Sequence, residues 1–290
     1  MIFLADQKSA LVDLVGLLGS LLSLIIILIL MQLGERSLLY LGFALSASPV
    51  LVLVIAYFFA FSGRYAKYKP SLKCVDFSLS KGLMGLGVKF FIIQICVLLI
   101  FATSNVIIAR LFSPSYVAVY NIVFKYFSVV TLFFNIIMTT LWSAYTEAFV
   151  KQDFVWIKRM IRKMILLWVV FCFSSLVMVL VSESVYRIWI GSTIHIPIEV
   201  TISMALYVCI INWHYIFASF NNGASKLQIQ MMLLLFGGVV YIPLATILSR
   251  QVGLAGISIA MILVLIPCGF LSPLQSYKLI HGKARGIWNK

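Results

Sequence analysis

Long apolar runs separated by short polar segments form the dominant pattern of this chain. A membrane-spanning helix needs about 20 mostly apolar residues. By this rule the apolar runs predict eight spans, at residues 11–33, 38–62, 86–109, 116–140, 164–182, 198–220, 229–249 and 253–272. The runs are continuously apolar, whereas strands of a membrane barrel alternate with a period of two. The pattern therefore predicts an all-α integral membrane protein with about eight transmembrane helices.

The composition agrees with lipid as the solvent of this chain. Its 290 residues are 63% hydrophobic and 10% charged, with a mean hydropathy of +1.12. A soluble domain is roughly half apolar and about a quarter charged. The net charge of +14 could suggest nucleic-acid binding, but the basic residues lie between apolar runs and form no basic face on a soluble domain. We therefore expect membrane lipids as partners and no nucleic acid.

The positions of lysine and arginine predict the orientation in the membrane. Basic residues gather between the second and third spans, between the fourth and fifth, and after the eighth, and Lys8 and Lys226 lie on the same side. The intervening loops carry one basic residue each, namely Arg36, Arg110, Arg187 and Arg250. Loops rich in lysine and arginine stay in the cytoplasm. The sequence thus predicts a multi-pass protein of the bacterial cytoplasmic (inner) membrane with both termini cytoplasmic.

Two stretches on the predicted cytoplasmic side, 76–85 and 146–163, mix bulky apolar residues with lysine and arginine. This mixture is typical of helices that lie in the membrane surface. We expect both stretches to form such surface helices. The alternative, a solvated connector with ordinary positive-inside bias, fits the same charges.

Catalytic and metal-binding constellations are nearly absent from the sequence. The eight acidic residues show no spacing that suggests a carboxylate pair, the three histidines have no ligand-spaced partner, and the five cysteines form no CxxC pair. There is no phosphate-binding glycine loop. We therefore expect no catalytic residue, metal or cofactor, and a protein that is not an enzyme. Energy for any transport must come from a gradient or a partner.

Polar residues inside the span at 116–140 are the most informative feature. At 100° per residue, five of them share an arc of about 80°: Asn121, Lys125, Ser128, Asn135 and Thr139. Such a stripe indicates either a wet cavity or a packed seam, because serine, threonine and asparagine also join membrane helices. Lys125 lies about 13 Å inside the span and costs at least ~2.5 kcal/mol there, unless it faces water or an anion or its chain reaches back to the interface.

The span at 86–109 adds further candidates. Gln94 and Asn105 share one of its faces and are predicted to join the same cavity. Lys89 is turned about 140° from Gln94, so we expect its side chain to reach the headgroups. It remains a secondary candidate for the cavity.

The span at 198–220 carries polar residues on two arcs and is therefore predicted to lie inside the bundle. One arc includes Glu199 and His214, and the other includes Asn212 and Ser219. Glu199 and His214 are secondary candidates for the cavity. His214 could relay protons, but a hydrogen-bonded packing histidine is the expected role.

Several of these residues stand in stretches that resemble a known family. The similar stretches are Ala5-Asp6-Gln7-Lys8, Gly87-Val88-Lys89-Phe90-Phe91 with Gln94, Tyr120-Asn121 through Lys125-Tyr126-Phe127-Ser128, and Leu141-Trp142-Ser143-Ala144-Tyr145-Thr146-Glu147-Ala148. In this order and placement the chain resembles the polysaccharide-biosynthesis and O-antigen flippases (lipopolysaccharide biosynthesis proteins) of the multidrug/oligosaccharidyl-lipid/polysaccharide exporter superfamily. The resemblance covers most of the chain and is strongest over 70–163.

The resemblance implies a fold of two six-helix lobes around a central, often cationic cavity. Residues 1–62 would be the last two helices of the N-terminal lobe, and 63–85 a cytoplasmic connector between the lobes. Residues 86–272 would be the C-terminal lobe and 273–290 a cytoplasmic tail. Four helices would then be expected upstream of Met1.

The function implied by the resemblance is transport of an oligosaccharide, such as an O-antigen or capsule repeat unit, linked to polyprenyl diphosphate. The cargo would move from the cytoplasmic to the outer leaflet by alternating access. A polysaccharide polymerase and glycosyltransferases would be partner proteins. We expect Lys125 to recognise the diphosphate, since a deep cation offsets the lost hydration of an anion.

Three other functions stay open at the level of sequence. A drug/cation antiporter of the same superfamily should need a carboxylate within the membrane, but the spans offer only the peripheral Asp13 and Glu199. A membrane-bound polysaccharide polymerase or glycosyltransferase should show a large outer loop, and the longest one here is about 183–197. A purely structural membrane subunit is the third alternative.

Overall fold

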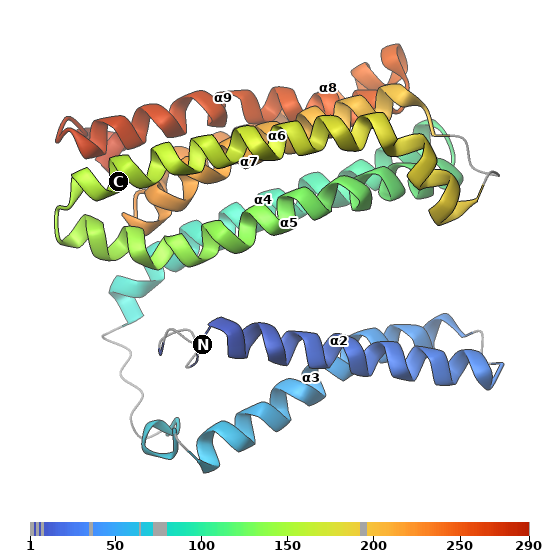
Figure 1. Cartoon of the computed structure of the whole chain (residues 1–290), viewed down its shortest axis with the longest axis horizontal. Coiled ribbons are helices and arrows are strands. Elements are labelled where there is room, and N and C mark those ends of the chain that lie inside the picture. The colour runs from blue at the N-terminus through green and yellow to red at the C-terminus, as the bar shows by residue number, and fades with distance from the viewer. Residues whose placement is uncertain are drawn as a thin grey trace. The chain divides into compact units, whose positions relative to one another are not determined.

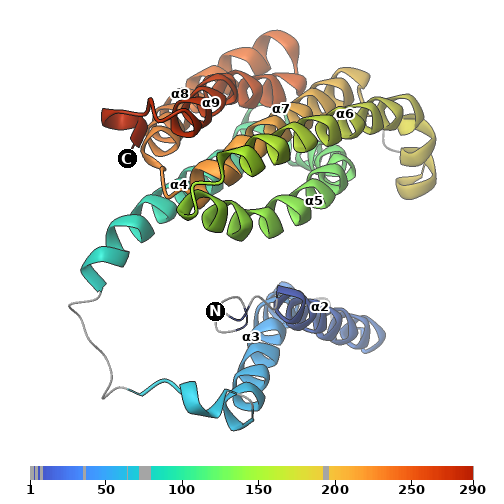
Figure 2. The same cartoon turned by 60° about the vertical axis from the view of Figure 1, so that its left-hand side comes forward.

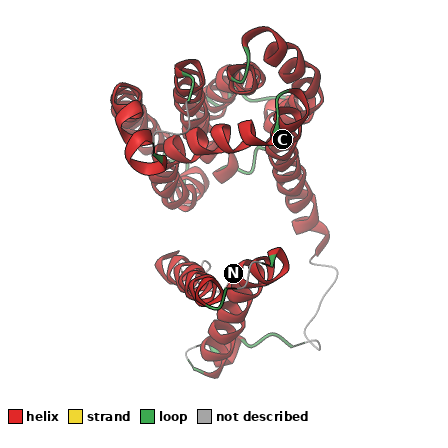
Figure 3. Cartoon of the chain, turned by 90° about the vertical axis from the view of Figure 1, so that its right-hand side faces the viewer, coloured by secondary structure: helices red, strands yellow, loops and turns green. Residues whose placement is uncertain are grey.

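The computed structural model describes residues 3, 6, 9–34, 37–63, 65–71, 80–191 and 196–289. Within these ranges all regular structure is helical, and Figure 3 shows only helices joined by loops. The chain divides into two compact units, Met1–Phe77 and Ser78–Lys290. The division falls within the segment 63–85 that the sequence analysis treats as a connector.

The first unit is a helical hairpin. Its helices are α2 (Ser9–Gln32) and α3 (Leu38–Ser62), followed by the short 3-10 helix η1 (Ala66–Tyr68). The two long helices pack closely at one point, because a Cβ atom on Gly19 would lie only 3.0 Å from the Cα atom of Pro49. A small residue at such a crossing lets two membrane helices approach.

The second unit is a six-helix bundle (Figures 1 and 2). Its elements are α4 (Ser80–Leu111), α5 (Pro114–Val150), α6 (Phe154–Ile190), α7 (Ile198–Gly223), α8 (Gln228–Val252), α9 (Ala255–Ile280) and the 3-10 helix η3 (Gly286–Asn289). Helix α7 packs against α5, α6 and α9, while α8 packs against α4 and α9. Most side chains of α7 are buried, which confirms the prediction that this helix lies inside the bundle.

In the part of the chain that the structure describes, eight helices are long and apolar enough to cross a membrane. Their outer faces carry many exposed leucine, isoleucine, valine and phenylalanine side chains. An apolar exterior of this extent is stable in lipid and not in water. The prediction of an all-α integral membrane protein is therefore confirmed, and the helices make it a multi-pass one.

The prediction of a surface-lying helix at 146–163 is wrong. Helix α5 continues to Val150 and α6 begins at Phe154, so the segment is the tip of a long helical hairpin. Asp153 caps α6, because its Oδ1 atom accepts a hydrogen bond of 3.0 Å from the backbone nitrogen of Trp156. The helices continue because their inner faces stay apolar and buried, as Tyr145 and Ile157 show.

Two other predicted boundaries also change. The other predicted surface helix covers 76–85. Its residues 76–79 lie outside the described residues, and from Ser80 onward the chain belongs to α4. Helix α9 runs to Ile280, beyond the predicted end at 272. Neither Pro267 nor Pro273 ends this helix, since neighbouring helices can compensate for proline in a membrane bundle.

Candidate functional site

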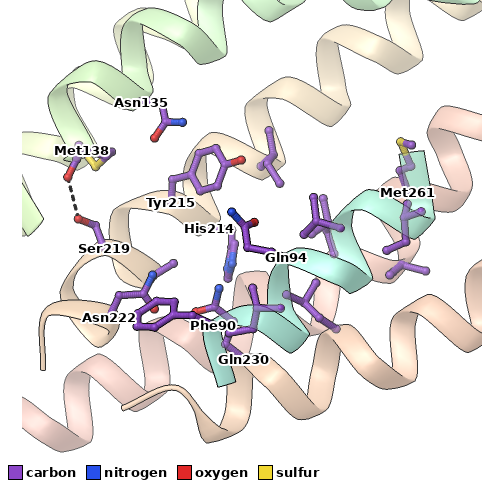
Figure 4. A pocket seen from close by; sticks show the side chains of 18 of the residues that line it. Phe90, Gln94, Asn135, Met138, His214, Tyr215, Ser219, Asn222, Gln230 and Met261 are labelled. Atoms are coloured by element: carbon purple, nitrogen blue, oxygen red, sulfur yellow. Dashed lines mark hydrogen bonds between the residues drawn. The ribbon is translucent and has the colours of Figure 1, made fainter. Parts of the chain in front are cut away.

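A cavity of about 430 Å³ lies within the six-helix bundle, between α4, α5, α7, α8 and α9. Its hydrogen-bonding lining comes from amides, hydroxyls and one imidazole: Gln94, Asn135, Thr139, Tyr207, His214, Tyr215, Ser219, Asn222 and Gln230. In Figure 4, Gln94, Asn135 and Tyr215 project from three different helices into the same space. Among the described residues that line the cavity, none is a lysine, an arginine or a carboxylate.

The cavity follows from the way α4 and α5 pack. Helix α4 packs mainly on α8 and α5 mainly on α7, so α4 and α5 meet through a few large side chains. The rings of Phe90 and Trp142 lie 5.4 Å apart between their centroids, and those of Phe101 and Phe124 lie 5.2 Å apart. Gln94 stands on α4 between these two aromatic pairs. The pairs therefore hold the helices apart where the polar side chains face each other.

The buried face of α7 forms one wall of the cavity. His214 is buried, and its Nδ1 atom lies 3.3 Å from the hydroxyl oxygen of Ser272 on α9. The hydroxyl of Ser219 donates to the backbone carbonyl of Met138 on α5 at 3.0 Å, as the dashed line in Figure 4 marks. These bonds place polar groups at fixed positions inside an apolar bundle.

The amide of Asn222, at the end of α7, has an unused acceptor. Its Oδ1 atom is buried and accepts no hydrogen bond from any residue that the structure describes. A buried acceptor without a partner costs about 1–3 kcal/mol. Asn222 lines the cavity through other atoms, because this oxygen is not open to it.

The predicted polar stripe of α5 divides into two parts. Asn135 and Thr139 line the cavity. Asn121 instead donates from Nδ2 to the Oδ1 atom of Asn105 on α4 at 3.2 Å and to the carbonyl of Val117 at 2.9 Å. The stripe is thus a contact between α4 and α5 at Asn121 and a wall of the cavity at Asn135 and Thr139.

The remaining candidates lie outside the cavity lining. Ser128 donates to the backbone carbonyl of Lys125 at 2.8 Å, and the Lys125 side chain is exposed on α5. Lys89 is half-buried on α4, and Glu199 is exposed in the first turn of α7. Within the described chain, no ion pair joins Lys125 to Glu199.

Asn222 and Gln230 also line the cavity, although the sequence pattern did not predict them as site residues. They lie at the end of α7 and the start of α8, next to a short turn. The predicted spans placed Asn222 in a loop and Gln230 at the end of a helix. Polar residues are common at both positions and do not indicate a site there. The signal that could have found them is the tight connection, since it brings both helix ends to one point.

The arrangement can hold a ligand by hydrogen bonds and ring contacts. The polar lining supplies both donors and acceptors, and Phe90 and Trp142 supply aromatic faces. In the described residues, no group of three or more histidine, cysteine, aspartate or glutamate side chains could hold a metal ion. The described lining is uncharged and combines these hydrogen-bonding groups with a larger number of apolar side chains. Comparisons with protein-family models, curated proteins and solved structures return no match for this chain.

Proposed function

We propose that this chain works as a flippase that moves an oligosaccharide linked to polyprenyl diphosphate from the cytoplasmic to the outer leaflet of the bacterial cytoplasmic membrane. The observation that carries the proposal is a cavity inside a bundle of membrane-length helices, whose described lining is uncharged and sets hydrogen-bonding side chains among a larger number of apolar ones. Polar groups within a membrane bundle are costly and commonly mark the path of a substrate. The sequence resemblance to O-antigen and other polysaccharide flippases supports the same cargo.

The lining suits sugar units. Amide side chains such as Gln94 and Asn135 can both donate to and accept from sugar hydroxyls. The volume of about 430 Å³ falls within the usual range of small-molecule sites, about 300–1,000 Å³, and holds a portion of a glycan chain.

The diphosphate of the cargo would meet Lys125. This lysine lies ten residues before Asn135 on α5, which is about 15 Å along the helix and about 80° around it. An exposed cation at this distance from the cavity could bind the anion while the cavity solvates the sugars. The drug/cation antiporter is less well supported, because no carboxylate is found among the described residues of the lining.

Transport would use two lobes that rock against each other. The second unit would be one complete lobe, and the α2–α3 hairpin would belong to the other. Alternating access in such transporters is largely a rigid-body movement of one bundle against another around a fixed site. A polysaccharide polymerase and glycosyltransferases would act after and before this step.

Two neighbouring threonines allow a matched test of the proposal. Thr139 and Thr140 are both exposed on α5, and each hydroxyl donates to the carbonyl three residues earlier, at 2.9 Å and 2.8 Å. Only Thr139 lines the cavity. Thr139→Val keeps the shape and removes one neutral hydrogen-bonding group, which should weaken binding of the lipid-linked oligosaccharide by about 2- to 12-fold. Thr140→Val should leave it unchanged.

Binding is measured with the purified chain in lipid nanodiscs, and transport by complementation of a flippase deletion with a protein that contains both lobes. A stronger version replaces Asn135 with leucine, which removes both the donor and the acceptor of the amide. If wild-type chain binds no lipid-linked oligosaccharide, the proposed cargo is wrong. If it binds and Thr139→Val behaves as Thr140→Val does, the cargo lies elsewhere than in this cavity.

A further inference from the structure

The first turns of α6 carry a strongly basic face. Four cationic side chains on this face are all exposed: Lys158, Arg159, Arg162 and Lys163. At 100° per residue they cover an arc of about 140° on one side of the helix. They follow directly after the turn between α5 and α6 (Figure 1).

The four cations have no anionic partner in the described structure. The two side-chain ion pairs found there join Lys151 to Glu147 and Arg187 to Glu183. The nearest carboxylate in sequence, Asp153, accepts the capping hydrogen bond from Trp156. The basic face therefore presents its full positive charge outward.

The opposite side of the same turns is anchored. Ile157, Ile161 and Met164 are buried in the core that α6 shares with α5 and α7. The ring of Trp156 packs edge-on against that of Tyr145 at 5.8 Å. Because its inner side is packed in this way, the helix cannot roll the cations inward.

An apolar strip continues the basic face along α6. The exposed fractions are 69% for Leu166, 52% for Val169, 58% for Val170 and 65% for Phe173. By helical geometry these residues share the side of α6 that carries the cations, since they fall between about 20° and 120° when Lys158 is set at zero. One side of α6 thus presents a charged segment followed by an apolar one.

We propose that this face of α6 is a binding site for anionic phospholipids of the surrounding membrane. The rise from Lys158 to Lys163 is about 7.5 Å. Each headgroup layer of a bilayer is about 5–8 Å thick, from the difference between its total and hydrocarbon thickness. The four cations therefore match the headgroup phosphates in depth, and Leu166 to Phe173 match the upper part of the acyl chains.

The occupant is a bulk phospholipid and not a free phosphate or the polyprenyl diphosphate cargo. The cations are all exposed and form an open row, and the adjoining apolar strip supplies contacts that a free phosphate cannot use. Open rows of lysine and arginine at a membrane surface attract anionic headgroups. This site lies on α6, which contributes no residue to the cavity lining, so it stands independently of the proposed transport function.

The experiment compares lipid binding by native mass spectrometry of the whole chain, with phosphatidylglycerol and phosphatidylcholine as probes. Each basic residue near an anionic surface contributes about fivefold in affinity. The variant K158Q/R159Q/R162Q/K163Q should lose at least about tenfold in phosphatidylglycerol binding and keep its phosphatidylcholine binding. The charge-conserving variant K158R/R159K/R162K/K163R should bind like wild type.

A control variant, R110Q/R187Q/R250Q, removes cations from the opposite ends of the helices and should keep the selectivity for phosphatidylglycerol. Circular dichroism checks that all variants stay helical. Equal preference for the two lipids in wild type, or unchanged preference in the quadruple glutamine variant, would overturn the proposal. Displacement of phosphatidylglycerol by undecaprenyl diphosphate or by millimolar inorganic phosphate would also overturn it, since the site would then belong to the cargo or to a free anion.

Discussion

Helices α8 and α9 approach each other closely at Gly256, where a single methyl group should be costly. A Cβ atom at this position would lie 2.4 Å from the carbonyl carbon of Leu248 and 2.4 Å from the backbone nitrogen of Ser249. Carbon atoms in contact normally lie about 3.5–4.0 Å apart. Because both obstructing atoms belong to the backbone of α8, no side-chain rotation can relieve the clash.

The two helices would have to separate by about 1 Å to accept Gly256→Ala. Extra methyl groups in a well-packed core cost about 1–3 kcal/mol, and more where the backbone must move. We expect a loss of about 3 kcal/mol in the free energy of unfolding. The cavity should change too, because Gln230 on α8 and Val264 on α9 both line it.

Gly238 on α8 offers a matched control. A Cβ atom there would meet nothing within 4 Å. Gly238→Ala should therefore stabilise the chain by up to about 1 kcal/mol, since alanine is a better helix former than glycine. The two identical substitutions in one hairpin should differ by about 4 kcal/mol.

The assay is equilibrium unfolding of the purified chain in mixed detergent micelles. Tryptophan fluorescence can follow it, because Trp168 and Trp213 pack against each other with ring centroids 5.0 Å apart between α6 and α7. If Gly256→Ala changes the unfolding free energy by less than about 0.5 kcal/mol, the close approach of α8 and α9 is not as described and the reasoning fails.

Three further predictions concern orientation, charge and the helix seam. A fluorescent protein fused after Lys290 should fluoresce and alkaline phosphatase fused after Gly253 should be active, whereas phosphatase activity at Lys290 would reverse the orientation. Lys125→Met should abolish transport and leave the chain folded, since the side chain is exposed. Lys125→Arg keeps the charge in a different shape and should retain partial function. Normal transport by the methionine variant would contradict a role for Lys125 in binding the diphosphate. A double-mutant cycle that replaces Asn105 and Asn121 with leucine should show a coupling of about 0.6 kcal/mol in unfolding free energy and no loss of cargo binding, and a coupling near zero would contradict the seam.

The transmembrane character and the helical class could be predicted from the sequence because both depend on local properties. A run of about 20 apolar residues spans a membrane as a helix whatever surrounds it, since backbone groups in lipid must bond within the segment. The interior position of α7 could also be inferred, because its polar residues occupy two arcs that cannot both face lipid. Eight helices in the described chain match these predicted spans.

The ends of the helices and the use of the polar residues were decided by tertiary packing. The stretch 146–163 looks like a surface helix by composition, but contacts of Tyr145 and Ile157 with the bundle core continue α5 and α6 through it. Asn121 and Asn135 are the same residue type on the same face of α5, yet one bonds to α4 and the other lines a cavity. Helical periodicity shows which side of α5 is polar, but only the spacing between α4 and α5, set by the rings of Phe90 and Trp142, separates seam from cavity.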